Sequence, residues 1–129
     1  VFLDQPSVWA VERKSDGRLI GSVGLITDSA RQYGSARSLG YALGIRYWGQ
    51  GYMTETVRAV IRYGFEKMLL DVISATCYPD NPASRRVLEK CGFQYEGTLH
   101  RAELLYNGEI KDHLHFYLTR DRAGRSEEG

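Results

Sequence analysis

An arginine followed by two glycines, in the run Arg46-Tyr47-Trp48-Gly49-Gln50-Gly51, stands between a strand-like segment and a helix-like segment. Glycine at these positions lets consecutive backbone N–H groups point into one concavity without a Cβ in the way. The following helix would add the positive end of its dipole, so the loop suits a pyrophosphate group. The alternative is a tight turn with a satisfied arginine. The loop lacks the Gly-Lys-Ser/Thr ending of a triphosphate-binding loop and the G-x-G-x-x-G pattern of a dinucleotide fold.

Histidines and cysteines give no comparable signal of a metal or redox site. His113 and His115 are two residues apart and so share one face of a strand, but a metal would need a third ligand that the sequence does not identify. Cys77 and Cys91 form no C-x-x-C pair, and we expect two buried thiols in a reducing cytosol. The sequence therefore predicts no metal, and ordinary packing roles for these four side chains.

Composition places the chain among ordinary globular proteins. It has 129 residues, 43% of them hydrophobic and 26% charged, which fits one domain with a real core. The net charge of +1 argues against a nucleic-acid binder that works by neutralising many phosphates. No apolar run approaches the roughly 18 residues of a membrane span, and no signal peptide is visible. We therefore expect a cytoplasmic protein without nucleic-acid or membrane partners.

Hydrophobic patterning and turn residues predict the elements that must position the loop. β-branched and aromatic residues in partial alternation favour strands at 7–14 and 19–27, joined by a turn at 15–18 into a hairpin. A polar segment at 28–37 is predicted to be a loop. A third strand follows at 38–45, directly before the glycine loop.

Beyond the loop, the pattern changes to helical spacing. The periodic residues predict a helix that continues to about Leu70: Met53, Val57, Val60, Ile61, Phe65 and Met68. A β-branched, apolar run at 72–78 is typical of a strand buried on both faces. A short helix is expected at 83–90, with Pro82 at its first turn and Gly92 beyond its end.

Two long strands are predicted at the end of the chain, at 93–106 and 109–119 around the hairpin signal Asn107-Gly108. Residues 120–129 form a polar tail. The order strand-helix-strand implies a right-handed crossover between nearby parallel strands, while the other strands can be antiparallel. The predicted class is therefore α/β (α+β): one domain over residues 1–119, with a mixed, mostly antiparallel twisted sheet and helices on its faces.

The sequence resembles the GNAT superfamily of N-acetyltransferases, and within it the branch that contains ribosomal-protein N-terminal acetyltransferases. The resemblance covers about residues 7–119 and lies in two stretches, LGYALGIRYWGQGYMTETVRAVIRYGFE and DNPASRRVLEKCGFQYEG. Their motifs are Q/R-x-x-G-x-G/A at Arg46–Gly51, then N-x-x-S and Gly-Phe at Asn81, Ser84, Gly92 and Phe93. The resemblance implies transfer of the acetyl group of acetyl-CoA to a primary amine, by direct attack in a ternary complex. The acceptor would be a protein or peptide N-terminus or a small-molecule amine.

The resemblance also implies where acetyl-CoA would bind. Its pyrophosphate would contact backbone amides of the loop and the helix start, and its pantetheine arm would run along the third strand. Gly44 would mark the point where this strand parts from a parallel strand at 72–78. An amide near Leu43 would stabilise the oxyanion, and Asn81 would hydrogen-bond the pantetheine arm. The implied cofactor-binding residues are Leu43, Gly44, Ile45, Arg46, Trp48, Gly49, Gln50, Gly51, Tyr52, Met53, Thr54, Asn81 and Ser84.

The chain departs from the family pattern at the proton donor and at the base. Many relatives have a tyrosine that acts as the general acid seven residues after the asparagine that corresponds to Asn81. This chain has Leu88 at that position, so Ser84 becomes the candidate proton donor to the CoA sulfur. The alternative role for Ser84 is a hydroxyl that caps the first turn of its helix. The usual glutamate before the Gly-Tyr of the third strand is replaced by Leu39. Glu103 and Asp112, in the last two strands, are the alternative bases, and a structural role is the other reading of Asp112.

A weak base would suffice for some acceptors. An α-amine has a pKa of roughly 7.7–8, against about 10.4 for lysine, so much of it is already neutral near pH 7.5. A protein or peptide N-terminus would then need little help from the enzyme.

The family's usual front end, a strand and two helices before the hairpin at 7–27, is missing from this sequence, which begins at Val1. Either the chain is a fragment, or the acceptor groove is open, or a partner chain such as a second copy in a homodimer completes it. Two alternatives to an enzyme follow from these departures: an acyl-CoA-binding module of the same fold without turnover, and a protein-interaction domain.

Overall fold

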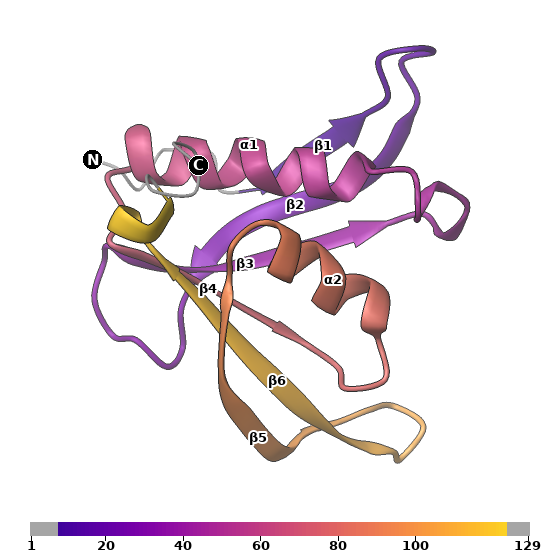
Figure 1. The fold of residues 1–129 in the computed structure, drawn as a ribbon. Coiled ribbons are helices and arrows are strands. Elements are labelled where there is room, and N and C mark those ends of the chain that lie inside the picture. The colour runs from indigo at the N-terminus through magenta and orange to yellow at the C-terminus, as the bar shows by residue number, and fades with distance from the viewer. Residues whose placement is uncertain (1–7, 124–129) are drawn as a thin grey trace.

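The first half of the chain forms three neighbouring antiparallel strands in a computed structural model that describes residues 8–123 (Figure 1). These strands are β1 (Val8–Glu12), β2 (Leu19–Thr27) and β3 (Ala36–Leu43). β1 and β2 make the predicted hairpin, and β2 pairs antiparallel with β3. The side chains of β1 alternate between exposed and half-buried, which confirms the predicted alternation in this segment.

The second half supplies the helices and the remaining strands. α1 (Tyr52–Glu66) leads to β4 (Val72–Cys77), and α2 (Pro82–Lys90) leads to the hairpin of β5 (Gln94–Leu104) and β6 (Ile110–Thr119). The six strands lie in the order β1-β2-β3-β4-β6-β5. Only β3 and β4 pair in parallel among the described strands, and the predicted mixed, mostly antiparallel sheet is confirmed.

β3 and β4 separate earlier than the sequence predicted. Their parallel pairing begins at Ala36 with Val72 and ends at Leu39 with Ala75. The prediction that they part near Gly44 is wrong, because Gly44 lies beyond the end of β3 and donates its N–H to Ile20 of the β2 side. The backbone pairing with β4 has already ended by then, and the space between the strands becomes a pocket.

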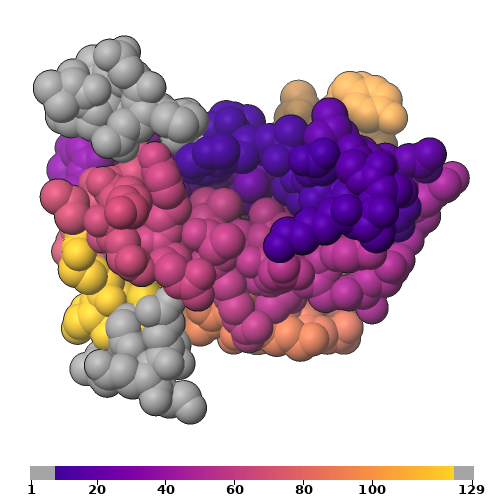
Figure 2. Space-filling view, turned by 90° about the horizontal axis from the view of Figure 1, so that it is seen from above, coloured from indigo at the N-terminus to yellow at the C-terminus, as the bar shows by residue number. Residues whose placement is uncertain are grey.

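Both α1 and α2 pack on the same face of the sheet, in front of the strands in Figure 1. Alternate residues of each strand point toward them, so a single apolar core is buried under the helices. The largest fully buried side chains of this core are Leu25, Met53, Val57, Leu70, Ile73, Leu88, Phe116 and Leu118. Figure 2 shows the β1–β2 hairpin (indigo to purple) lying directly beside α1 (magenta).

The opposite face of the sheet is only partly covered, by the predicted polar loop. Asp28 is buried in this loop and accepts hydrogen bonds from the Ser74 hydroxyl of β4 and from two backbone amides of the loop. Arg31 crosses to β5, where it pairs with Glu96 at 2.7 Å. These contacts hold the loop over the first half of β4 and leave the second half of that face open.

Several predicted boundaries differ from the observed ones, most of them by one or two residues. α1 ends at Glu66 rather than near Leu70, because Leu69 takes a left-handed φ of 55° that a helix cannot continue through. β3 ends at Leu43, and Ile45–Tyr47 form a single 3-10 turn instead of continuing the strand. Residues 120–123 form a helical turn, while 1–7 and 124–129 lie outside the described residues.

Candidate active site

The glycine loop between β3 and α1 has the backbone that an anion site requires. Gly49 and Gly51 adopt φ values of 82° and 83°, in the left-handed region that favours glycine. Gly51 is also the N-cap of α1, and no side chain caps the free amides of this helix end. A Cβ at either glycine would meet nothing within 4 Å, so backbone conformation rather than crowding accounts for glycine here. The free amides and the helix dipole together suit a phosphate group.

A pocket of about 180 Å³ lies beside this loop, and we call it the loop pocket. Arg86 and Lys90 of α2 line it opposite the glycines, and they add positive charge that the sequence reasoning did not identify. Six of the predicted cofactor-binding residues do not line it: Gly44, Ile45, Arg46, Gln50, Asn81 and Ser84. Ile45 is 92% exposed. The lining residues are Leu43, Tyr47, Trp48, Gly49, Gly51, Tyr52, Met53, Thr54, Ala83, Arg86, Val87 and Lys90.

The edge of β3 beyond Leu39 presents free backbone groups to the gap. Gly44 donates its N–H to Ile20 O on the β2 side, so strand alternation turns the N–H groups of Leu43 and Tyr41 toward the opposite edge. The carbonyl of Leu43 already accepts a hydrogen bond of 3.1 Å from the Trp48 indole. The two amides remain as donors at the place where a pantetheine arm could pair with β3.

A second pocket, of about 290 Å³, occupies the gap where β3 and β4 have separated, and we call it the gap pocket. It brings three of the predicted residues together: Asn81, Ser84 and Glu103. Leu43 lies on the same strand edge and lines the loop pocket, so the two pockets follow one another along β3. The residues that line the gap pocket are Leu39, Gly40, Tyr41, Thr76, Cys77, Tyr78, Asn81, Ser84, Glu103 and His113.

The side chains of Asn81 and Ser84, at the start of α2, make different hydrogen bonds. The side-chain oxygen of Asn81 accepts the Ser84 backbone N–H at 3.1 Å, so Asn81 caps the helix. The Ser84 hydroxyl is therefore not the cap, and it lies 2.6 Å from the hydroxyl of Tyr41 on β3. Ser84 is buried, with 6% of its surface exposed.

Glu103 lies on the open face of the sheet, within a cluster of polar groups. His113 Nε2 lies 2.9 Å from Glu103 Oε1, and the Tyr78 hydroxyl donates to the same oxygen at 3.0 Å. The hydrogen bonds from His113 and Tyr78 hold the pKa of Glu103 below its usual range, although burial opposes them. The sequence analysis identified Glu103 but not Tyr78, and it predicted only an ordinary packing role for His113.

The structure places Asp112 away from both pockets. Its carboxylate accepts the Arg101 backbone N–H at 2.8 Å and lies 3.0 Å from His100 Nδ1. Arg101 has a left-handed φ of 54°, inside the irregular stretch of β5 that precedes Glu103. Hydrogen bonds from Arg101 and His100 lower the pKa of Asp112, and they tie β6 to this stretch of β5.

Two leucines occupy positions where the family resemblance implies polar catalytic groups. Leu88 is fully buried in the core under α2, and Leu39 is 5% exposed where β3 and β4 stop pairing. Neither leucine side chain can act as a general acid or a general base. Both contribute to the apolar core.

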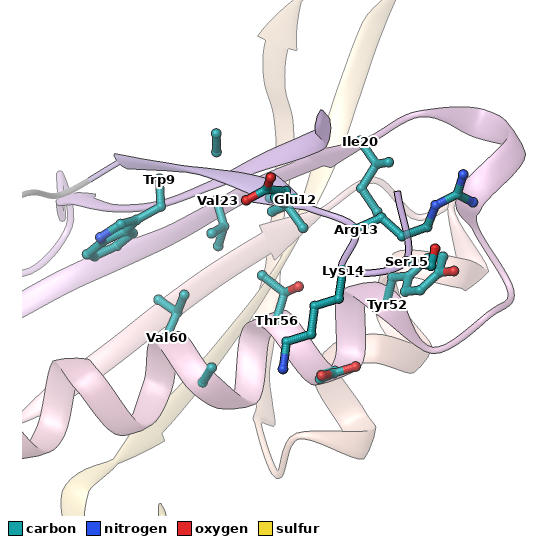
Figure 3. Close-up of a pocket in the computed structure, with 14 residues that line it drawn as sticks. Trp9, Glu12, Arg13, Lys14, Ser15, Ile20, Val23, Tyr52, Thr56 and Val60 are labelled. Carbon is teal, nitrogen blue, oxygen red and sulfur yellow. The ribbon is translucent and has the colours of Figure 1, made fainter. Parts of the chain in front are cut away.

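A larger cavity, of about 420 Å³, lies between β1 and α1 (Figure 3). Trp9 and Val60 line one end of it, and the charged side chains of Glu12 and Lys14 line it further toward Tyr52. None of the predicted catalytic residues lines this cavity. The chemistry-bearing side chains gather instead around the smaller gap pocket.

The remaining sequence features give no competing site within the described part of the chain. Cys77 and Cys91 are buried free thiols whose pKa values are raised by burial. Between residues 8 and 123, no group of three or more His, Cys, Asp and Glu side chains could hold a metal ion. No helix in this range has the length and apolar character needed to cross a membrane.

Comparison with known proteins gives a consistent answer. Residues 3–94 match the model of a family described as an acetyltransferase (GNAT) domain. The chain is 36% identical over 104 residues to the uncharacterized N-acetyltransferase YoaA of Bacillus subtilis, covering 81% of this chain and 57% of YoaA. It is 36% identical over 81 residues to the [ribosomal protein uS5]-alanine N-acetyltransferase of Escherichia coli, covering 63% of this chain and 41% of that protein.

A solved structure supports the same relationship. The ribosomal-protein-S5-alanine acetyltransferase of Vibrio fischeri superposes with a TM-score of 0.79 at 31% identity, covering 88% of this chain and 61% of that one. The chain spans little more than half of the length of the curated relatives it matches first.

Proposed function

The chain belongs to the GNAT family of acetyltransferases, and from this premise we propose that it transfers the acetyl group of acetyl-CoA to a primary amine. The observation that carries the proposal is the gap pocket, which joins the free amides of β3 to Ser84 on one side and to Glu103 on the other. The loop pocket follows it along β3 and offers helix-end amides, Arg86 and Lys90 to a pyrophosphate.

In the proposed reaction, the nitrogen of a neutral amine bonds to the acetyl carbon as the carbon–sulfur bond breaks. The thioester of acetyl-CoA supplies the activated acetyl group. The amide of Leu43 would donate to the acetyl oxygen, where negative charge develops. The amine would enter from the open face of the sheet, where the carboxylate of Glu103 attracts it and accepts its surplus proton directly or through water. Holding thioester and amine together supplies much of the rate enhancement.

The proposal is tested by measuring acetyl-CoA binding by thermal shift and release of free thiol with a panel of amines. The panel contains spermidine, free lysine and a short peptide with an N-terminal alanine, because one relative is named for acetylating an alanine of ribosomal protein uS5. Thiol release that depends on one of these amines supports the enzyme. Binding without thiol release would instead favour an acyl-CoA-binding module, and no binding would favour an interaction domain.

We predict that the two carboxylate candidates separate when each is changed to its amide. Glu103→Gln should lower kcat/KM for the amine about 10- to 100-fold, toward the low end for a lost base. Asp112→Asn should stay within a few-fold of the parent, because asparagine can still accept the Arg101 N–H. Steady-state kinetics on both variants is the measurement. A larger loss for Asp112→Asn would remove Glu103 from its role.

We also predict that the pH dependence belongs to the acceptor. The pKa of Glu103 is lowered by His113 and Tyr78, so this carboxylate stays ionised above its depressed pKa and cannot produce a limb near neutrality. The rise of kcat/KM with pH should therefore follow the amine, at about 8 for a peptide N-terminus and about 10.4 for a lysine side chain. A limb at the same pH for both acceptors would assign it to an enzyme group instead.

A further inference from the structure

Two hydroxyl groups from different elements meet across the gap between β3 and α2. The Tyr41 hydroxyl lies 2.6 Å from Ser84 Oγ and 3.3 Å from the Ser84 carbonyl oxygen. Tyr41 stands two residues beyond Leu39, the last residue of β3 that pairs with β4. Both side chains line the gap pocket, so this contact spans the space that the separating strands leave.

The contact is not needed to begin α2 or to complete the pairing of β3. Asn81 caps the helix through the Ser84 backbone, which leaves the Ser84 hydroxyl for another purpose. Burial raises the pKa of Tyr41 to about 12, so its hydroxyl keeps its proton throughout the working range. A protonated phenol keeps a proton to donate, and two oxygens of Ser84, the hydroxyl at 2.6 Å and the carbonyl at 3.3 Å, can accept it.

Chemistry decides what the Ser84 proton can do. A thiol such as that of CoA has a pKa of about 8.5, far below that of an aliphatic hydroxyl, so a serine does not give up its proton to a thiolate. It can donate a hydrogen bond to the sulfur as negative charge develops there. This requires its single proton to point into the pocket rather than at Tyr41.

We propose that Tyr41 is a positioning residue, whose hydroxyl donates to Ser84 Oγ and so directs the Ser84 proton toward the leaving sulfur. This inference rests on the proposed acetyl transfer. As the carbon–sulfur bond breaks, the electron pair stays on the sulfur, CoA leaves as a thiolate, and Ser84 and Tyr41 each retain their proton. The proton lost by the amine passes to Glu103 or to water, and the thiolate takes a proton from solvent.

The test is a double-mutant cycle of Tyr41→Phe and Ser84→Ala, with kcat measured at saturating amine and acetyl-CoA affinity measured by calorimetry. If Tyr41 acts through Ser84, Tyr41→Phe lowers kcat about tenfold with little change in affinity, and the double variant is no slower than Ser84→Ala. Tyr33→Phe is the matched control, because it removes a tyrosine hydrogen bond of 3.0 Å to Asp71 outside both pockets.

Each outcome of the cycle decides something different. Losses that multiply in the double variant would overturn the positioning role, as would a Tyr41→Phe variant that loses affinity and thermal stability while its kcat stays unchanged. A parent chain that binds acetyl-CoA but releases no thiol with any amine would overturn the proposed function together with this inference. Thiol release by the parent with multiplied losses would overturn the inference alone.

Discussion

Replacing Gly51 with aspartate is expected to lower acetyl-CoA affinity at least about 100-fold, because a carboxylate would stand where the pyrophosphate needs amides and positive potential. Gly51 has a φ of 83° and is the N-cap of α1, and aspartate tolerates both the left-handed conformation and the N-cap position. The variant should therefore fold. Gly49→Asp is expected to behave similarly, since Gly49 has a φ of 82° and lines the same pocket.

An isosteric variant separates the effect of the added charge on acetyl-CoA affinity from the effect of the added side-chain volume. Gly51→Asn has nearly the same volume and the same tolerance of the left-handed region, but no charge, so it should bind acetyl-CoA much better than Gly51→Asp. Gly34→Asp adds the same charge in an open loop that does not line either pocket, and it should bind like the parent. Isothermal calorimetry gives the three affinities. Binding by Gly51→Asp within a few-fold of the parent would make the loop an ordinary turn.

Ser84→Ala is expected to lower kcat about 10- to 100-fold while acetyl-CoA affinity changes little. A hydrogen bond to a charged group contributes about 1.5–3 kcal/mol, and each 1.36 kcal/mol is a factor of ten in rate. The loss falls on kcat because the sulfur carries negative charge only as the bond breaks. Leu88, at the position where the family resemblance implies a proton donor, offers none, since it is fully buried and apolar.

The control for Ser84→Ala is Ser74→Ala. Ser74 lies in the first half of β4, away from the gap pocket, and its buried hydroxyl donates a hydrogen bond of 2.8 Å to Asp28. This variant should lose thermal stability but keep its kcat, because Ser74 lines neither pocket. An unchanged kcat for Ser84→Ala, with chemistry shown to limit turnover by single-turnover kinetics, would remove Ser84 from the reaction.

Local sequence patterns were sufficient for the elements and for the glycine loop. The helical spacing of residues 53–65 depends on nearby residues and is found in α1. The position of the glycine loop before this helix was also predicted, but the left-handed φ values of Gly49 and Gly51 were not. The end of α1 was missed because it depends on the conformation of Leu69, which no sequence pattern marks. The parting of β3 and β4 was placed five residues late, because it depends on contacts between segments distant in sequence.

The candidate site was harder to predict because its contacts join distant elements. Arg86 and Lys90 line the loop pocket because the polar face of α2 is turned toward the glycine loop. The helical pattern in the sequence does not specify which element that face contacts. The sequence does not distinguish Glu103 from Asp112 as the base, because both are acidic residues of the last two strands. The irregular pairing of β5 between Leu99 and Glu103 sends Glu103 to the gap pocket, while Asp112 holds the Arg101 amide.

The central claim is that acetyl-CoA lies along β3, from the glycine loop into the gap pocket. A backbone amide NMR titration of the ¹⁵N-labelled chain with acetyl-CoA tests it most directly. We expect shifts at Leu43, Gly51 and Ser84 that saturate together, and little change at Trp9 and Val60 in the larger cavity beside α1. Shifts confined to Trp9 and Val60, or no saturable shifts at all, would contradict the account.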